Sequence, residues 1–116
     1  MALPKREKLK NRYVFRNIRK LRLITRSEFF SCYGKKSNLE EQCIPKVGLI
    51  ISKKKLKLAW QRNKAKRKIE EAYRIIKSHY LEEAGKFQYL VFFLEPTVLD
   101  ADFEELKQKM EKIFKC

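Results

Sequence analysis

The sequence predicts a single compact α+β domain, in which helix, strands, helix, strand and helix surround a mixed sheet of about four strands. Three observations support this fold class. The 116 residues, 44% of them apolar, suffice for one hydrophobic core and leave little room for a second domain. Apolar residues recur at helical spacing over 58–81 and 102–115. Residues 46–52 and 88–94 have the apolar patterns of strands.

The N-terminal part of the chain is predicted to form a basic arm and then a helix. Residues 1–8 are basic, so we expect a flexible arm there and one domain over residues 9–116. Over residues 11–21, apolar side chains recur three and four positions apart among arginines, which predicts an amphipathic helix with a cationic face. The apolar side of this helix is formed by Val14, Ile18 and Leu21.

Four segments have the composition of β-strands. Residues 29–33 are rich in aromatic side chains, and a shorter strand is expected near 23–25. Residues 46–52 alternate in polarity, which predicts a half-buried strand. Residues 88–94 are almost all apolar, which predicts a strand covered on both faces. The polar segment 34–42 is expected to be a loop.

Two longer helices are expected in the C-terminal half. The helix over 58–81 would pack on the sheet through one apolar stripe, formed by Ala65, Ile69, Ala72, Ile76 and Tyr80. Its opposite side would be polar, with Asn63, Arg67 and Arg74, flanked by Lys64 and Lys68. The helix over 102–115 follows Pro96, and its core side would be Phe103, Leu106, Met110, Ile113 and Phe114.

The charge of the chain indicates a polyanionic partner. Twenty-nine Lys and Arg against fourteen Asp and Glu give a formal net charge of +15. Such a surface repels itself in the folded state, so a nucleic acid is the natural counterpart. The cations gather in residues 5–26 and 52–77, whereas residues 79–105 are rich in acids. We therefore expect one side of the domain to bind RNA and the other to be ordinary surface.

Other classes of protein are not indicated by the sequence. No apolar run approaches the length of a membrane helix, and the N-terminal residues lack a secretory signal, so we expect a cytoplasmic protein. The three cysteines, Cys32, Cys43 and Cys116, include no C-x-x-C pair and are expected to be reduced thiols rather than zinc ligands. His79 is the only histidine and is expected to be a surface residue rather than a general base. No metal-ligand spacing is present, so no metal site is expected.

The most informative segments are residues 46–55 and 62–68. The first is a strand that ends in three lysines, and the second begins a helix with five cations in seven residues. Cations early in a helix oppose its dipole, which favours negative charge at that end. An external phosphate would use the exposed N–H groups and the cationic side chains together. This pattern therefore predicts an RNA-binding helix start.

These segments resemble the bacterial ribonuclease P protein component. That family combines a V-G-x-x-x-S-K-K strand, an R-N-R-x-K-R helix start, a following A-[FY], and an N-terminal L-x-x-x-x-x-F helix after a basic opening. The matching segments of this chain are Val-Gly-Leu-Ile-Ile-Ser-Lys-Lys at 47–54, Arg-Asn-Lys-Ala-Lys-Arg at 62–67, Ala-Tyr at 72–73, and residues 9–15. The order of elements also matches, so the resemblance covers about residues 3–115.

The resemblance implies an unusual left-handed βαβ crossover. It also implies a function, namely the protein subunit of ribonuclease P, which binds ribonuclease P RNA and the 5′ leader of precursor tRNA. Such a subunit assists the endonucleolytic 5′ maturation of tRNA, while the RNA and its Mg²⁺ ions carry the catalysis. No catalytic residue, metal site or tightly bound cofactor is then expected on this chain, nor is a membrane or DNA partner.

The family also implies which residues touch RNA. Contacts with the catalytic RNA are expected at the start of the second helix, from Arg62, Asn63, Lys64, Lys66, Arg67 and Lys68. Contacts with the leader and its phosphates are expected from Phe15, Arg19, Phe30, Tyr33, Lys46, Lys53 and Lys54. Aromatic faces accept any base, at about 1–3 kcal/mol each, which suits a leader of variable sequence.

Four positions depart from the family pattern. Lys64 replaces an arginine and loses its bidentate geometry. Glu70 stands where the family favours another arginine, which would weaken the RNA-binding face. Residues 55–61 form a loop that is one residue longer than usual and lacks a glycine. Arg19 replaces an aromatic residue in the first helix.

Two other functions share part of this pattern. A structural RNA-binding protein of a ribosome-like particle would have the same charge and fold class. A stand-alone nuclease would need a metal on the acidic cluster of Asp100, Asp102, Glu104 and Glu105, but acids at a helix start are typical of dipole compensation. A protein that binds double-stranded DNA is disfavoured because no helix-turn-helix pattern is present.

Overall fold

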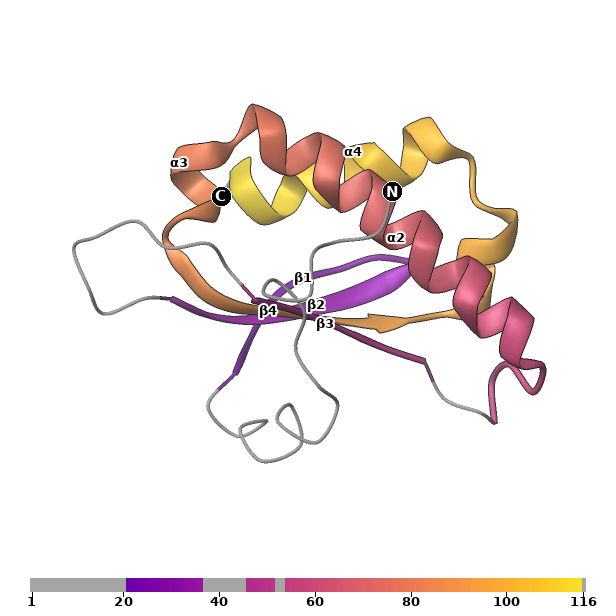
Figure 1. The fold of residues 1–116 in the computed structure, drawn as a ribbon. Coiled ribbons are helices and arrows are strands. Elements are labelled where there is room, and N and C mark those ends of the chain that lie inside the picture. Colours follow the sequence, from indigo (N-terminus) through magenta and orange to yellow (C-terminus); the bar gives the residue numbers. More distant parts are fainter. Residues whose placement is uncertain (1–20, 37–45, 52–53, 116) are drawn as a thin grey trace.

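The computed structural model describes residues 21–36, 46–51 and 54–115. The predicted arm over 1–8 and the helix predicted before Leu21 lie outside these ranges. The described elements are β1 (Arg22–Arg26), β2 (Phe30–Lys36), β3 (Lys46–Ile50), α2 (Ala59–His79), the single turn α3 (Leu81–Ala84), β4 (Phe87–Leu94), the 3-10 turn η3 (Pro96–Asp100) and α4 (Phe103–Lys115) (Figure 1). In the part of the chain that the structure describes, no helix combines the length and apolarity needed to span a bilayer.

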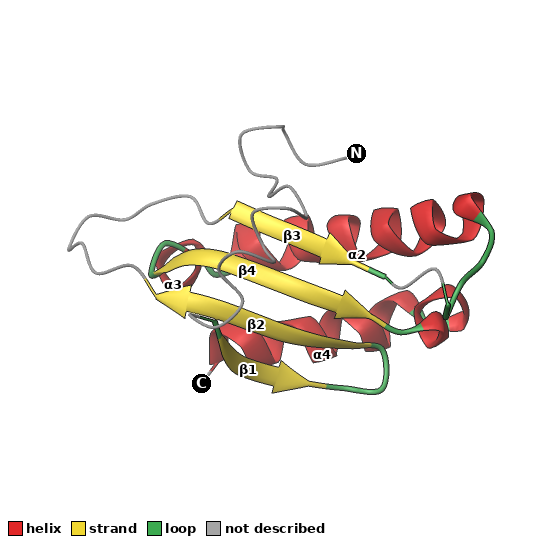
Figure 2. Cartoon of the chain, turned by 90° about the horizontal axis from the view of Figure 1, so that it is seen from below, coloured by secondary structure: helices red, strands yellow, loops and turns green. Residues whose placement is uncertain are grey.

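The four strands form one mixed sheet in the order β1-β2-β4-β3. β2 is antiparallel to β1 and to β4, whereas β3 is parallel to β4, with Gly48 opposite Val91. Both long helices lie on one face of the sheet (Figure 1). In Figure 2, seen from the other face, β3 and β4 point the same way and α2 crosses behind them. This arrangement is the left-handed βαβ crossover, so the predicted α+β fold class is confirmed.

The core lies between the sheet and the two long helices. The predicted stripe on α2 is confirmed, because Ala65, Ile69, Ala72 and Ile76 are all buried. Aromatic rings fill the centre of this layer. Phe92 of β4 meets Phe30 of β2 and Tyr73 of α2 edge to face, with centroids 5.5 and 5.9 Å apart. Such pairs contribute about 0.5–1.5 kcal/mol each beyond the area that they bury. α4 completes the core with Leu106, Met110, Ile113 and Phe114.

The long helix ends two residues earlier than predicted. Tyr80 has φ −133° and ψ 48°, outside the helical range, and the chain then makes the separate turn α3. The ring of Tyr80 stacks on Phe114 of α4, with centroids 5.9 Å apart and planes 21° from parallel. Tyr80 therefore packs on α4 while its backbone leaves the helix.

β2 is longer than the predicted strand, because it continues through Gly34 to Lys36, residues that were expected to belong to a loop. Gly34 allows this extension. A Cβ atom added there would lie 2.5 Å from Cδ1 of Ile24 and 2.9 Å from the carbonyl oxygen of Tyr89. Only a residue without a side chain lets β1, β2 and β4 approach so closely at this point.

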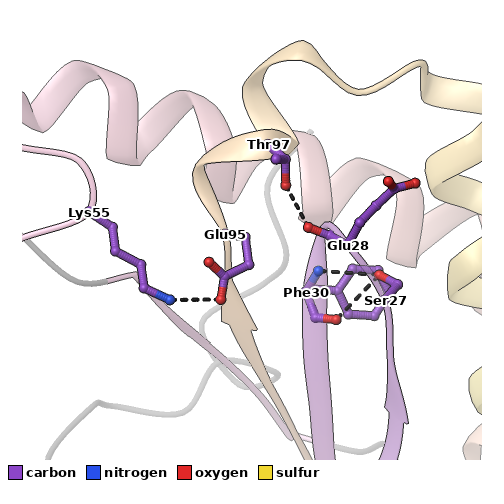
Figure 3. Close-up of polar contacts among 6 residues, drawn as sticks. All are labelled: Ser27, Glu28, Phe30, Lys55, Glu95 and Thr97. Atoms are coloured by element: carbon purple, nitrogen blue, oxygen red, sulfur yellow. Dashed lines mark hydrogen bonds and ion pairs between the residues drawn. The ribbon is translucent and has the colours of Figure 1, made fainter.

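Polar contacts fix the end of the sheet from which α2 departs (Figure 3). Nζ of Lys55, in the loop before α2, lies 2.7 Å from a carboxylate oxygen of Glu95, just after β4. The hydroxyl of Thr97 donates to the carbonyl oxygen of Glu28 at 2.6 Å. The hydroxyl of Ser27 accepts from the backbone N–H of Phe30 at 3.3 Å. The loop before α2 is therefore tied to the last strand.

Cys32 faces the core and has no exposed surface. Burial raises the pKa of its thiol far above the ordinary value, because a thiolate in an apolar layer loses its hydration. The reactive thiolate is thus scarce in the folded protein. Cys43 and Cys116 lie outside the described residues.

Candidate nucleic-acid interface

The first turns of α2 present polar and charged side chains to solvent. Asn63, Lys64 and Arg67 are exposed, Lys66 is half-buried beside them, and Ala65 faces the core. This alternation follows from the helical repeat, since residues three and four apart share a side. The first turn contains no acidic residue. We call Asn63, Lys64, Lys66 and Arg67 the α2 surface.

Arg62 both positions the α2 surface and adjoins it. Its Nη1 donates hydrogen bonds to the carbonyl oxygens of Leu56, at 2.8 Å, and Lys57, at 2.9 Å. These bonds hold the loop against the first turn of the helix. Because a guanidinium has five N–H groups, its other nitrogens can still donate to a phosphate. The predicted RNA contact at Arg62 is compatible with this geometry and stays a prediction.

The structure gives Lys68 a different role from the predicted RNA contact. Its ammonium group donates to the carbonyl oxygens of Leu99, at 3.4 Å, and of Ala101. These carbonyls belong to the last part of η3 and the residue after it, which α2 packs against. Lys68 therefore joins the helix to the segment between β4 and α4, and its charge is directed into the protein rather than toward a ligand.

Replacing Lys68 by methionine is expected to lower the free energy of unfolding by about 1–2 kcal/mol, because hydrogen bonds from a charged donor to half-buried carbonyls are lost. RNA affinity should stay within about threefold of that of the unchanged protein. Urea denaturation and filter binding measure the two quantities. Lys64→Met is the matched control, since it removes the same charge from the α2 surface and should lower affinity without lowering stability. If Lys68→Met lowered RNA affinity and left the free energy of unfolding unchanged, this role of Lys68 would be wrong.

A hollow of about 340 Å³ lies on the outer face of the sheet, the face opposite α2 and α4. It is lined by Leu21, Ser31, Tyr33 and Phe93. The rings of Tyr33 on β2 and Phe93 on β4 meet edge to face with centroids 5.4 Å apart. We call these four residues the sheet surface. It offers half-exposed aromatic rings, which are the groups that stack on unpaired bases.

Arg26 contacts the sheet surface, and two exposed lysines lie on β3 and in the turn that follows it. Nη2 of Arg26 lies 3.5 Å from the hydroxyl oxygen of Tyr33. Lys46 is exposed at the start of β3 and pairs with Tyr89, on the same face of the sheet as Phe93. Lys54 is exposed in the turn after β3. The contacts predicted for Lys46 and Lys54 fit these positions and stay predictions.

Three of the predicted leader contacts, Phe15, Arg19 and Lys53, lie outside the described residues. The prediction for Phe30 is wrong. Its side chain has no exposed surface and packs against Phe92 in the core. Phe30 and Tyr33 are three apart in one strand, so they point to opposite faces, and only Tyr33 reaches the outer face.

Sequence reasoning missed Phe93 and Arg26. It expected the strand 88–94 to be covered on both faces, but Phe93 is half-exposed. The signal was present, because two adjacent residues in a strand point to opposite faces, so Phe92 and Phe93 cannot both enter the core. The expected effect of Glu70 on RNA binding stays a prediction. Glu70 is only 7% exposed, and it lies three residues after Arg67 and four after Lys66, next to the α2 surface along the helix.

The titratable groups of α2 form no catalytic arrangement in the described part of the chain. A hydrogen bond from Arg74 lowers the pKa of the Glu71 carboxyl to about 2, so this carboxylate is ionised at neutral pH. His79 is exposed at the end of the helix. Across residues 21–36, 46–51 and 54–115, no three His, Cys, Asp or Glu side chains gather as metal ligands do. In the described residues, the candidate interface thus offers cations and aromatic rings.

Comparison with known proteins identifies the family. The model of the family described as Ribonuclease P matches residues 3–116. This chain belongs to the ribonuclease P protein family. A curated member, the ribonuclease P protein component of Stutzerimonas stutzeri (strain A1501), is 38% identical over 71 residues. That alignment covers 61% of this chain and spans half the length of the relative.

Solved structures of the ribonuclease P protein family share the fold of this chain. The protein from Thermotoga maritima superposes with a TM-score of 0.71 at 21% identity and covers 94% of this chain and 96% of its own. A protein from Staphylococcus aureus gives a TM-score of 0.63 at 25% identity, with 99% and 97% covered. A mutant of the Staphylococcus aureus protein, described as defective in mRNA degradation activity, gives 0.70 at 23% identity, with 96% and 87% covered.

Proposed function

We propose that this chain is the protein subunit of ribonuclease P. It binds the catalytic RNA through the α2 surface and Arg62, and it holds the 5′ leader of precursor tRNA on the sheet surface. The RNA and its bound Mg²⁺ ions cleave the phosphodiester bond, and this chain contributes no group to the reacting atoms. Family membership supports the proposal. The observation on which it mainly rests is the separation of the two surfaces.

The two surfaces belong to different parts of one small domain. The α2 surface lies at the start of a helix on the inner face of the sheet, whereas the sheet surface lies on the outer face (Figures 1 and 2). A protein of this size can therefore hold two RNA segments at once without competition between them. Simultaneous binding is what a subunit needs if it is to bring a substrate to a catalytic RNA.

The chemistry of each surface suits its proposed ligand. Lys64, Lys66 and Arg67 neutralise phosphates, which in a folded RNA lie close together and otherwise require Mg²⁺ to offset their repulsion. We therefore expect the protein to lower the Mg²⁺ concentration needed for cleavage. Tyr33 and Phe93 stack on bases without regard to their identity, so the sheet surface suits leaders of differing sequence.

Reconstitution with a bacterial ribonuclease P RNA at low Mg²⁺ tests the proposal. The protein is expected to restore cleavage of precursor tRNA at a Mg²⁺ concentration where the RNA alone is inactive. It should also tighten binding of precursor tRNA more than binding of mature tRNA, because mature tRNA lacks the leader. Cleavage rates and dissociation constants with and without the protein measure both effects.

A variant with Tyr33→Ala and Phe93→Ala is the control for the leader. It should still assemble with the RNA. The ratio of its affinities for precursor and mature tRNA should fall about tenfold, since one stacked base contributes about 1–3 kcal/mol. A structural protein of another RNA particle would bind RNA and leave cleavage unchanged. Unchanged cleavage would refute the proposed function. Equal tightening of precursor and mature tRNA would refute the leader site.

A further inference from the structure

The first turn of α2 carries an exposed indole. Trp60, the only tryptophan of the chain, is 62% exposed, and Leu58, at the N-cap position two residues earlier, is 52% exposed. Exposing these apolar side chains is unfavourable, because water gains freedom when an apolar surface of this size is covered. A large aromatic side chain that stays outside the core is therefore a candidate binding group.

Trp60 stands in line with the cations of the α2 surface. Residues three, four and seven apart share one side of a helix, so Trp60 falls in a row with Asn63, Lys64 and Arg67. All four side chains are exposed, whereas Ala65 on the other side is buried. The rise of a helix places Arg67 about 10 Å along the axis from Trp60. The row thus combines a flat apolar ring with two positive charges.

The start of α2, which carries Trp60, is held in place by contacts of neighbouring residues. Arg62, half a turn further along the helix, donates hydrogen bonds to the carbonyl oxygens of Leu56 and Lys57 in the preceding loop. Leu56 is buried, and the ion pair between Lys55 and Glu95 joins the same loop to the end of β4. The indole therefore projects from an anchored helix start, and little order has to be created when a ligand covers it.

The neighbours of Trp60 specify the chemistry of its partner. Lys64 and Arg67 attract an anion, and the first turn offers no acidic side chain and no side-chain cap from Leu58. A partner that meets both the ring and the charges must present a flat π-system next to phosphates. An unpaired nucleotide of RNA has this composition, whereas an acidic peptide offers charge without a stacking face.

We propose that Trp60 stacks on an unpaired base of the RNA that binds the α2 surface. This inference rests on the proposed function, since it takes the catalytic RNA as the ligand, and it adds a contact that none of the predicted RNA-binding residues provides. The cations neutralise the phosphates of the strand, and the indole fixes its register by covering one base.

The emission of Trp60 tests the proposal directly, because no other tryptophan contributes. Titration of the full chain with ribonuclease P RNA is expected to quench this emission and to protect it from acrylamide. Inorganic polyphosphate, a polyanion without bases, should compete with the RNA for the protein. Added alone, it should leave the emission of Trp60 unchanged. In filter binding, Trp60→Ala should weaken RNA affinity about tenfold, with an unchanged salt dependence, because no ionic contact is lost.

Two variants act as controls for this loss. Trp60→Phe keeps a stacking ring and should bind RNA nearly as tightly as the unchanged protein. Leu81→Ala removes another exposed apolar side chain, 64% exposed on α3, and should bind RNA with unchanged affinity. Circular dichroism spectra should show that all three variants are folded, since neither side chain belongs to the core.

The outcomes separate this proposal from the proposed function. If RNA binds the unchanged protein tightly without changing the emission of Trp60, and Trp60→Ala binds RNA with unchanged affinity, the stacking contact is wrong and the RNA-binding function stands. If polyphosphate changes the emission as RNA does, the indole responds to charge, and base stacking is again wrong. If the unchanged protein does not bind the RNA at all, the proposed function itself fails.

Discussion

Changing Lys64, Lys66 and Arg67 together to glutamine is expected to weaken the binding of ribonuclease P RNA about 100-fold at about 0.1 M salt. Three charge-assisted contacts at roughly 1 kcal/mol each account for a loss of this size. The slope of log affinity against log salt should fall by about 2–3, because each lost phosphate contact removes about 0.7–0.9. Filter binding across a salt series measures both quantities.

A control with the same change in net charge separates local contact from general attraction. Changing Lys86, Lys109 and Lys112 to glutamine removes three positive charges away from the α2 surface. This variant should keep most of the affinity and a nearly unchanged salt slope. Equal losses in the two variants would mean that the RNA responds to overall charge, and the α2 surface would then have no special part in binding.

Replacing Phe30 by alanine is expected to lower the free energy of unfolding by about 3–5 kcal/mol. The ring is fully buried and packs edge to face on Phe92, so its loss removes buried apolar surface and leaves a cavity. Domains of this size are stable by only about 5–15 kcal/mol, so the variant should be close to unfolding at room temperature. Urea denaturation followed by circular dichroism measures the change.

Tyr33→Ala is the matched comparison, since Tyr33 lies on the same strand and faces the other way. Its loss should cost about 1 kcal/mol of stability, the contribution of its ring contact with Phe93, and should instead weaken binding of the leader. If Phe30→Ala were fully stable and specifically lost leader binding, the burial of Phe30 would be the wrong explanation of its role.

Local sequence patterns predicted most of the elements but not all of their ends. The stripe of Ala65, Ile69, Ala72 and Ile76 predicted α2 and its buried side, because a helical repeat needs no information from distant residues. The extension of β2 through Gly34 was missed. A glycine in a polar segment is typical of a loop, and here the space that it leaves is used by Ile24 and by the backbone of Tyr89. That reason exists only in the assembled sheet.

The same limit applies to the candidate interface. The exposed cations Lys64 and Arg67 of the α2 surface were predicted, since the helical repeat and the family pattern both place them away from the core. The roles of Lys68 and Phe30 depend on partners far along the chain, namely the carbonyls after η3 and the ring of Phe92. Composition does not show whether a lysine or a phenylalanine has such a partner, so both were assigned to RNA.

The position of β4 between β2 and β3 affects how the protein can be made. β3 has only β4 as a neighbour in the sheet, and the whole of α2 separates the two strands in the sequence. During synthesis, β3 and α2 therefore leave the ribosome before the strand on which both depend exists. The four-stranded sheet can form only after residues 87–94, which form β4, have been made. A break between α2 and β4 would accordingly give two fragments, each of which needs the other in order to fold.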